Sequence, residues 1–353
     1  MRKLLYFLAA VVVLYLGITY YFSSLILHTP DRDLATVYQM NEDRWNLDLD
    51  SLLQTLPPRE EIEFRSPYDG ITLRGWLFLP DSARCGVVMA HGYSVNRANM
   101  LKYAPIFDSC RCAMLLYDHR GHGGPQGSDE APASGGYHEA TDLIAASDFL
   151  AARTGLAPGR IGWFGESWGG AAVIMAAARA SRRIGGEAEA FGGRAKAATI
   201  PGGEAGASGG RAEAATIPGG PAWVVAESPF ADWESAVMER GLKEYGVGLN
   251  LLTPGAFAWV GYRAGVDFSA VSTVQAAAEL EVPLLLFHSL ADTLTGPGQA
   301  DEIAAATPAD LLTYHALDWG AWHAHNIIWD RQAYTQLVLD FLGDWCQRSP
   351  AVE

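Results

Sequence analysis

With 353 residues, 49% of them hydrophobic, the chain is long enough to bury a sizeable core in one large α/β domain or in two smaller ones. Its 25 basic and 40 acidic side chains give a net charge of −15. This excess of negative charge argues against nucleic acid as a partner and against electrostatic docking on anionic lipid.

The amino terminus predicts a membrane anchor at residues 1–27. Arg2 and Lys3 precede residues 4–27, a run without charged side chains that exceeds the roughly 20 apolar residues of a transmembrane helix. The alternative is a cleaved signal peptide, but that has a shorter apolar centre, whereas residues 20–22 read Tyr-Tyr-Phe, like an interfacial aromatic belt. Basic residues before the run and acidic ones after it favour a single-pass protein with its folded domain outside the cytoplasm.

The folded domain is expected over residues 59–353. Residues 28–58 are polar and mixed in composition, so we expect a linker there, with one short helix at most. The domain begins with a hairpin signal, because residues 61–65 alternate apolar with charged side chains and a second strand at 71–79 follows an Asp-Gly turn.

After the hairpin, short apolar runs alternate with helical patterns. This alternation predicts a mostly parallel sheet covered by helices on both faces. The expected strands lie at 86–90, 113–117, immediately before Ser167, 223–226, 282–287 and within 309–316, and the expected helices at 137–153, 168–183 and 330–346.

Two segments interrupt the alternation. Residues 192–203 recur almost unchanged at 209–220, and such Gly/Ala-rich copies bury too little apolar surface to fold alone, so residues 185–221 are predicted to be a flexible surface insertion. Residues 231–271 form a predicted helical cap that is rich in aromatic residues. Those aromatic side chains belong either to the core or to the lining of an acyl pocket, and the sequence leaves both interpretations open.

The most informative motif is G-E-S-W-G at residues 165–169. An apolar strand precedes it and an Ala-rich helix follows, the context of a tight strand-to-helix turn that presents a serine hydroxyl at the carboxyl edge of a sheet. Ser167 is therefore the candidate nucleophile. Residues 206–210 also fit G-x-S-x-G, but neither a strand nor a helix flanks them, so we reject that match.

A serine hydroxyl needs an imidazole to accept its proton and a carboxylate to orient that imidazole. In the order expected for this turn, serine, acid and then histidine, Asp292 follows the strand at 282–287 and His323 precedes the last helix. Both side chains should therefore reach the edge of the sheet beside Ser167.

Other residues could take these roles. Glu227 or Asp232 is the alternative acid, and His325 is the alternative base. A zinc site using His323 and His325 would need a third ligand, and the sequence has no helical H-E-x-x-H motif to supply one. We therefore expect neither a metal nor a cofactor.

These motifs together resemble the α/β-hydrolase superfamily, in particular its serine-aminopeptidase-like and lysophospholipase-like members, some of them membrane-anchored. The resemblance covers about residues 60–343 and rests on H-G-Y at 91–93, D-x-R-G-x-G at 118–123, the motif containing Ser167, and the segments containing Asp292 and His323.

The resemblance implies an oxyanion hole formed by the backbone N–H groups of Tyr93 and Trp168. It also implies that His91 shapes the oxyanion loop and that Asp118 lies in a structural turn, which His119 and His122 help to organise. The sequence departs from the family pattern at two positions. Ser289 and Trp322 stand where glycine is usual, and such bulkier residues would narrow the pocket or displace His323.

The four cysteines, at 85, 110, 112 and 346, lack metal-ligand spacing. They are either ordinary thiols or, in an oxidising compartment, Cys85 bridges to Cys110 or Cys112, because these residues begin neighbouring strands.

The sequence therefore predicts a membrane-anchored serine hydrolase that cleaves esters or other acyl compounds of small-molecule size. Membrane tethering and an aromatic cap favour lipid-like substrates. Peptide or amide substrates are an alternative that the sequence leaves open. The alternatives are a catalytically silent scaffold that acts as a membrane-anchored binding protein, and a secreted soluble enzyme if residues 1–27 are removed.

Overall fold

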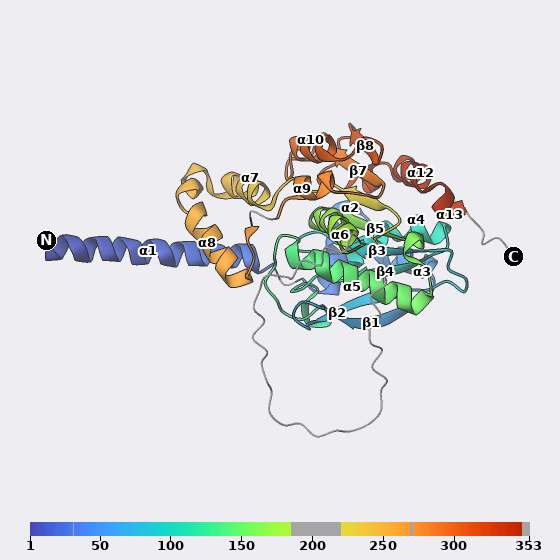
Figure 1. The fold of residues 1–353 in the computed structure, drawn as a ribbon, viewed down its shortest axis with the longest axis horizontal. Helices are drawn as coiled ribbons and strands as arrows, with labels where there is room; N and C mark the ends of the chain where they lie inside the picture. Colours follow the sequence, from blue (N-terminus) through green and yellow to red (C-terminus); the bar gives the residue numbers. More distant parts are fainter. Residues whose placement is uncertain (31, 185–219, 269–270, 348–353) are drawn as a thin grey trace, which may run out of the picture.

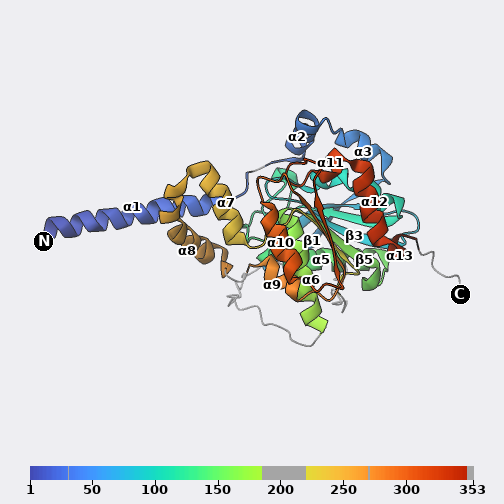
Figure 2. The ribbon, with the colours of Figure 1, turned by 90° about the horizontal axis from the view of Figure 1, so that it is seen from above.

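The computed structural model describes residues 1–30, 32–184, 220–268 and 271–347. The predicted insertion at 185–221 and the rejected serine motif at 206–210 lie outside these residues, except for the last two residues of the insertion. An α/β domain holds most of the chain, and the first helix projects from it (Figures 1 and 2).

Within the described residues, eight strands form one sheet in the order β1-β2-β4-β3-β5-β6-β7-β8. The predicted hairpin is confirmed, because β1 and β2 pair antiparallel, with Arg65 opposite Thr72. Strand β2 is also antiparallel to β4, and the six strands from β4 to β8 run parallel, as the alternating pattern predicts. The strands are β1 (Arg59–Arg65), β2 (Thr72–Phe78), β3 (Cys85–Ala90), β4 (Cys112–Tyr117), β5 (Ile161–Glu166), β6 (Val224–Glu227), β7 (Leu284–Ser289) and β8 (Leu312–Leu317).

Helices cover both faces of the sheet and bury a hydrophobic core on each side. One face carries α5 (Tyr137–Thr154), α6 (Trp168–Ile184), α9 (Thr273–Ala278) and α10 (Pro297–Ala306). The other carries α2 (Leu34–Trp45), α3 (Leu49–Thr55), the 3₁₀ helix η1 (Arg97–Lys102), α4 (Ala104–Ser109), α11 (Asn326–Trp329), α12 (Arg331–Leu342) and α13 (Asp344–Gln347). The 3₁₀ turns η2 (Gly124–Gln126) and η3 (Pro158–Arg160) lie in loops of the domain.

The single closing helix predicted at 330–346 is instead two helices, α12 and α13. Gly343, at φ +42°, ends α12, and its backbone N–H bonds to the carbonyl of Leu339. Glycine adopts such a positive φ without a Cβ clash, which explains why the helix ends at this residue.

The linker prediction for residues 28–58 is wrong, because the segment holds α2 and α3, both packed on η1. Asp33 and Asp48 cap these helices by accepting hydrogen bonds from the backbone N–H of the residue three positions later, at 2.8 and 2.9 Å. Val37 and Leu49 are buried in the core. The two aspartate caps were a sequence signal for these helices.

The cysteines form two disulfides, which rules out the interpretation as four ordinary thiols. Cys85 bonds to Cys112, one of the two pairings left open, and the two residues face each other in the parallel register of β3 and β4. Cys110 bonds to Cys346, a pairing the sequence did not suggest, because 236 residues separate the two.

Helix α1 (Arg2–Leu27) is long and apolar enough to cross a membrane, with a mean hydropathy of 2.0. Its carboxyl-terminal half lies beside the cap helix α8 (Thr253–Ala264) in both views (Figures 1 and 2). The rest of the cap is α7 (Trp233–Tyr245) and the 3₁₀ helix η4 (Val247–Leu251).

Candidate active site

Ser167 occupies the turn between β5 and α6 in a strained backbone conformation, with φ +53°. Its N–H donates to the carbonyl of Glu227 on the neighbouring strand at 2.7 Å. Both motif glycines are needed for close approach, since a Cβ at Gly165 would lie 2.1 Å from the carbonyl oxygen of Gly169, and one at Gly169 would lie 2.1 Å from that of Ala90. This geometry is that of a nucleophile elbow.

The structure brings Ser167, His323 and Asp292 together in one hydrogen-bonded chain. The Nε2 atom of His323 lies 2.7 Å from the Oγ of Ser167, and its Nδ1 atom lies 2.7 Å from an Oδ of Asp292. A neutral imidazole that donates from Nδ1 to the carboxylate leaves Nε2 free to accept the serine proton. The three side chains come from the ends of β5 and β7 and from the loop after β8.

The carboxylate of Asp292 is fixed in its orientation. Its other oxygen accepts hydrogen bonds from the backbone N–H groups of Leu294 and Thr295, at 2.8 and 2.9 Å. Burial raises the pKa of Asp292, but the hydrogen bonds from His323 and from the Thr295 N–H outweigh burial, so this pKa lies below its ordinary value. Asp292 is therefore ionised at neutral pH and can stabilise an imidazolium.

The two departures from the family pattern leave this geometry intact. The hydroxyl of Ser289 bonds to the carbonyl of Ala321, which ties the end of β7 to the loop that carries His323. The indole of Trp322 is partly exposed and donates to the hydroxyl of Thr293 at 3.4 Å. Neither Ser289 nor Trp322 is among the described residues that line the cavity beside Ser167, so these two side chains do not narrow the cavity.

The structure places the alternative acid and base residues in other contacts. Asp232 caps α7 by accepting from the N–H of Ser235 at 2.7 Å. Glu227 is buried and accepts from the side-chain amide of Asn326 at 2.7 Å. The ring of His325 packs on Trp45, with centroids 4.0 Å apart, and its Nδ1 bonds to the carbonyl of His323. Burial lowers the pKa of His325 to about 2.

The loop after β3 lies directly beside Ser167, since a Cβ at Gly92 would sit 3.3 Å from the Cβ of Ser167. The rings of Tyr93 and Trp168 stack at 5.4 Å with an interplanar angle of 11°. Trp168 is the first residue of α6, so its N–H is one of those without an intrahelical acceptor. The segment that follows β3 packs on one face of the sheet, whereas the segment that follows the neighbouring strand β5 packs on the other face. In open α/β sheets, ligands bind at the carboxyl ends of two neighbouring strands whose connections diverge in this way.

Three buried histidines hold this loop in place. His91 donates from Nδ1 to the carbonyl of Gly92 at 2.7 Å, and its Nε2 accepts from the N–H of His119 at 3.0 Å. His122 donates from Nδ1 to the carbonyl of Arg120 at 2.9 Å. Burial lowers the pKa of all three histidines, so they are neutral. These contacts are structural, as is the ion pair of the buried Asp118 with Arg97.

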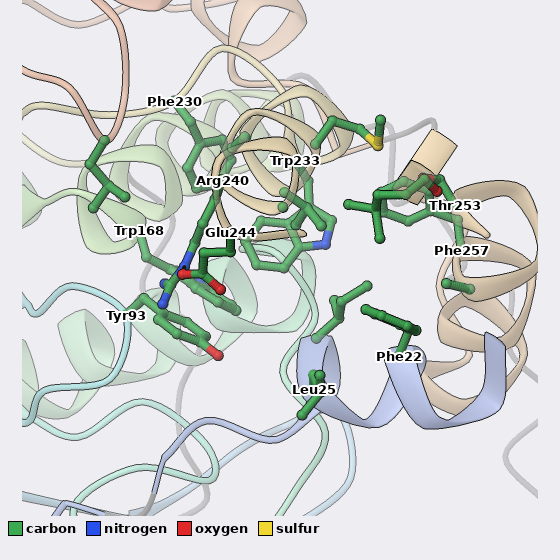
Figure 3. Close-up of a pocket in the computed structure, with 18 of the residues that line it drawn as sticks. Phe22, Leu25, Tyr93, Trp168, Phe230, Trp233, Arg240, Glu244, Thr253 and Phe257 are labelled. Atoms are coloured by element: carbon green, nitrogen blue, oxygen red, sulfur yellow. Dashed lines mark hydrogen bonds and ion pairs between the residues drawn. The ribbon is translucent and has the colours of Figure 1, made fainter. Parts of the chain in front are cut away.

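A cavity of about 490 Å³ extends from Ser167 under the cap, within the range of about 300–1,000 Å³ typical of small-molecule sites (Figure 3). Trp233 and Phe257 of the cap line it, whereas Trp259 packs on Tyr20 of α1 with ring centroids 5.4 Å apart. The cap aromatics thus divide between the two interpretations that the sequence left open. Within the part of the chain that the structure describes, no cluster of His, Cys, Asp and Glu side chains could hold a metal ion.

No protein-family model matches the sequence. The Bacillus subtilis protein YqkD, which is named as uncharacterised, is 23% identical over 346 residues, 98% of each chain. The thiohydrolase aneE of Aspergillus aculeatus is 32% identical over 118 residues, which cover 33% of this chain and 36% of that protein. Among solved structures, the Pyrococcus furiosus esterase Pf2001 matches with a TM-score of 0.61 at 18% identity, over 91% of this chain and 98% of the esterase.

The chain has the α/β-hydrolase fold. Other solved α/β hydrolases match it as well, among them GrgF of a Penicillium species, with a TM-score of 0.55 over 81% of this chain and 98% of that one. At less than 25% sequence identity, structural similarity shows the fold alone, so the chemistry has to be inferred from the residues of the site.

Within this α/β-hydrolase fold, the sequence did not reveal the role of Thr295. Its N–H donates to Asp292, and its hydroxyl lies 3.1 Å from the Nδ1 of His323. A local sequence signal for the contact between Thr295 and Asp292 did exist, because an aspartate side chain often accepts a hydrogen bond from a backbone N–H two or three residues later. The three α1 residues that line the cavity, Phe22, Leu25 and Ile26, had no sequence signal.

The buried Glu227 predicts an unusual pH dependence of stability. Burial raises the pKa of Glu227 to about 7, above its ordinary value of 4.5. Between these values the folded state holds a proton that the unfolded state has released, so stability should fall as pH rises through this window, by roughly 3 kcal/mol in all. Urea unfolding of the wild type and of Glu227→Gln at pH 4.5 and 7.5 measures how much of the change in unfolding free energy with pH depends on Glu227. An identical pH slope in both proteins would contradict the prediction.

Proposed function

We propose that this protein is a serine hydrolase that cleaves carboxylic esters or related acyl compounds through an acyl-enzyme. The observation that carries the proposal is the continuous hydrogen-bonded chain from Ser167 through His323 to Asp292, which begins in a largely apolar cavity. Such a cavity favours an acyl group, and the chain supplies the base that a serine nucleophile needs.

In the proposed reaction, His323 accepts the Ser167 proton as the serine oxygen attacks the substrate carbonyl. The N–H groups of Tyr93 and Trp168 stabilise the oxyanion, and each such donor is worth about 100- to 1,000-fold in rate. His323 then gives its proton to the leaving group, and the acyl-enzyme forms. Water, activated by the same imidazole, releases the acid and restores the serine.

The names of similar proteins support acyl transfer to water as the chemistry. Pf2001 is named as an esterase and aneE as a thiohydrolase, and both oxygen esters and thioesters react through this mechanism. The aromatic cap over the cavity supports lipid-like acyl groups. Comparing esters of graded chain length with aminoacyl amides would rank the substrate classes.

We also propose that α1 is an uncleaved anchor and that the hydrolase domain lies outside the cytoplasm. The basic residues Arg2 and Lys3 at the start of α1 support this orientation. The two disulfides support it as well, since such bonds persist mainly in oxidising compartments.

A fluorophosphonate probe tests the proposed nucleophile, because it reacts covalently with an activated serine. We expect the intact protein to be labelled and Ser167→Ala to remain unlabelled, whereas Ser147→Ala, at a half-buried position of α5, should be labelled like the wild type. Absence of labelling in the folded wild type would favour the catalytically silent scaffold. Labelling of Ser167→Ala would mean that another serine is the nucleophile.

A further inference from the structure

The helix proposed as the membrane anchor also forms a wall of the cavity. Phe22, Leu25 and Ile26, near the carboxyl end of α1, line the same cavity as Ser167. Figure 3 shows Phe22 and Leu25 on α1 facing the cap, with Trp233 and Phe257 opposite them. If α1 were removed as a signal peptide, the cavity would lose this wall.

Specific contacts fix α1 against the cap. Thr19 of α1 is fully buried against Gly255 of α8, where an added Cβ would lie 2.7 Å from the Thr19 side chain. Arg263 of α8 donates to the hydroxyls of Ser23 and Ser24, at 2.7 and 2.8 Å. Small residues at a helix crossing and hydrogen bonds between hydroxyl and polar side chains are typical of helices that associate within a membrane.

The length of α1 places these contacts at membrane depth. Arg2 and Lys3 mark the cytoplasmic boundary, and about 20 helical residues are needed to cross a hydrocarbon core of about 30 Å, so the opposite boundary lies near Ser23. Gly255 of α8 lies against the side chain of Thr19, four residues earlier, and against the hydroxyl of Tyr15. At 1.5 Å per residue, α8 therefore reaches at least about 6 Å below that boundary.

The apolar surface of the cap matches a position inside the hydrocarbon core of the membrane. Residues 246–262, which contain η4 and most of α8, include no charged side chain. Val247, Leu251 and Tyr262 are 84%, 77% and 81% exposed. Such exposed apolar side chains are unfavourable in water, whereas in a bilayer acyl chains solvate them.

The two ends of the cavity differ in polarity. Arg240 and Glu244 lie beside Tyr93 and Trp168 at the catalytic end, whereas Phe22 and Phe257 lie at the end formed by α1 and α8 (Figure 3). An ester with a long acyl chain matches this arrangement, with its carbonyl at Ser167 and its chain toward the bilayer.

We propose that η4 and α8 are embedded with α1 in the outer half of the bilayer and that the substrates are long-chain acyl esters, which reach Ser167 from the membrane between α1 and the cap. This inference rests on the proposed serine hydrolase and on its uncleaved anchor. Hydrolysis consumes one water and yields a fatty acid and an alcohol, and the acid can return to the bilayer by the same route.

The first test alters the α1 wall of the cavity. Full-length protein in phosphatidylcholine vesicles is assayed with 4-methylumbelliferyl palmitate and 4-methylumbelliferyl acetate, which share a leaving group. We expect Leu25→Trp to lower the palmitate-to-acetate ratio of kcat/KM by about tenfold, because the larger ring fills space for the chain. Val13→Trp, on the exposed part of α1, should leave the ratio as in the wild type. An unchanged ratio in Leu25→Trp would overturn the inference.

The second test alters the membrane surface of the cap. We expect Val247→Glu/Leu251→Glu to lower palmitate hydrolysis in vesicles at least tenfold while acetate hydrolysis in solution is kept, since charged side chains are unfavourable inside the hydrocarbon core. Ala152→Glu/Ala157→Glu adds the same charge to the opposite end of the domain and should retain both activities. Equal palmitate rates in the two double variants would overturn the inference.

Intact mass of the membrane-bound protein completes the test. A chain that retains residues 2–27 supports the inference, and a chain that begins after Leu27 overturns it. The proposed catalytic function fails differently, because the wild type would then hydrolyse neither ester. A Ser167-dependent activity that responds to neither test would leave the hydrolase proposal standing and would remove only the access route.

Discussion

Asp292→Asn is expected to lower kcat for ester hydrolysis by about 10⁴-fold without unfolding the protein. In the wild type the Asp292 carboxylate accepts the Nδ1 proton of His323 at 2.7 Å, which leaves Nε2 free to act as the base. An amide at this position can donate to Nδ1 and so favour the opposite tautomer, in which Nε2 carries the proton and cannot accept that of Ser167. Steady-state kinetics with a soluble ester measure the loss.

Asp232→Asn is the matched control, because Asp232 was the alternative acid and caps α7 instead. Its loss should weaken the α7 cap by about 1 kcal/mol at most and leave kcat within a few-fold of the wild type. If Asp232→Asn were the more damaging change while Asp292→Asn stayed near wild-type activity, the assignment of the acid would be wrong. The folded state of both variants can be checked by their urea unfolding midpoints.

The features of the site that could be predicted from sequence are local in the chain. The turn at Ser167 was predictable because a strand, two glycines in close contact and a helix occur within a few residues. The acid and the base could be proposed because parallel strands bring their carboxyl ends to one edge of the sheet. Whether Asp292 and His323 meet Ser167 depended on loops whose shape no local pattern defines.

The features that could not be predicted depend on contacts between distant segments. Phe22 and Leu25 belong to a run whose composition already matched a membrane span, so nothing in the sequence indicated that one face of it lines a cavity. Helices α2 and α3 resembled a linker because their few apolar residues, such as Val37, become a buried face only against η1. A single sequence records the composition of each segment but not its partner in the fold.

The disulfide between Cys110 and Cys346 should be the largest single covalent contribution to stability. It closes a loop of 236 residues, whereas the Cys85–Cys112 bond closes one of 27. Restricting the unfolded chain in these loops predicts losses of about 5 and about 3–4 kcal/mol when the bonds are removed. Urea unfolding of Cys110→Ala/Cys346→Ala and of Cys85→Ala/Cys112→Ala, each compared with the oxidised wild type, measures the two losses.

Removal of the longer cross-link should also affect the site, because it ties α13 to the end of α4, against which α12 packs. His323 lies in the loop that leads into α11 and α12, so we expect Cys110→Ala/Cys346→Ala to lose activity at a lower urea concentration than it loses the sheet signal. Thiol titration of the unfolded membrane-bound protein gives the decisive control. Four reactive thiols would show that the bonds do not form where the protein resides, and the placement of the domain outside the cytoplasm would lose its covalent support.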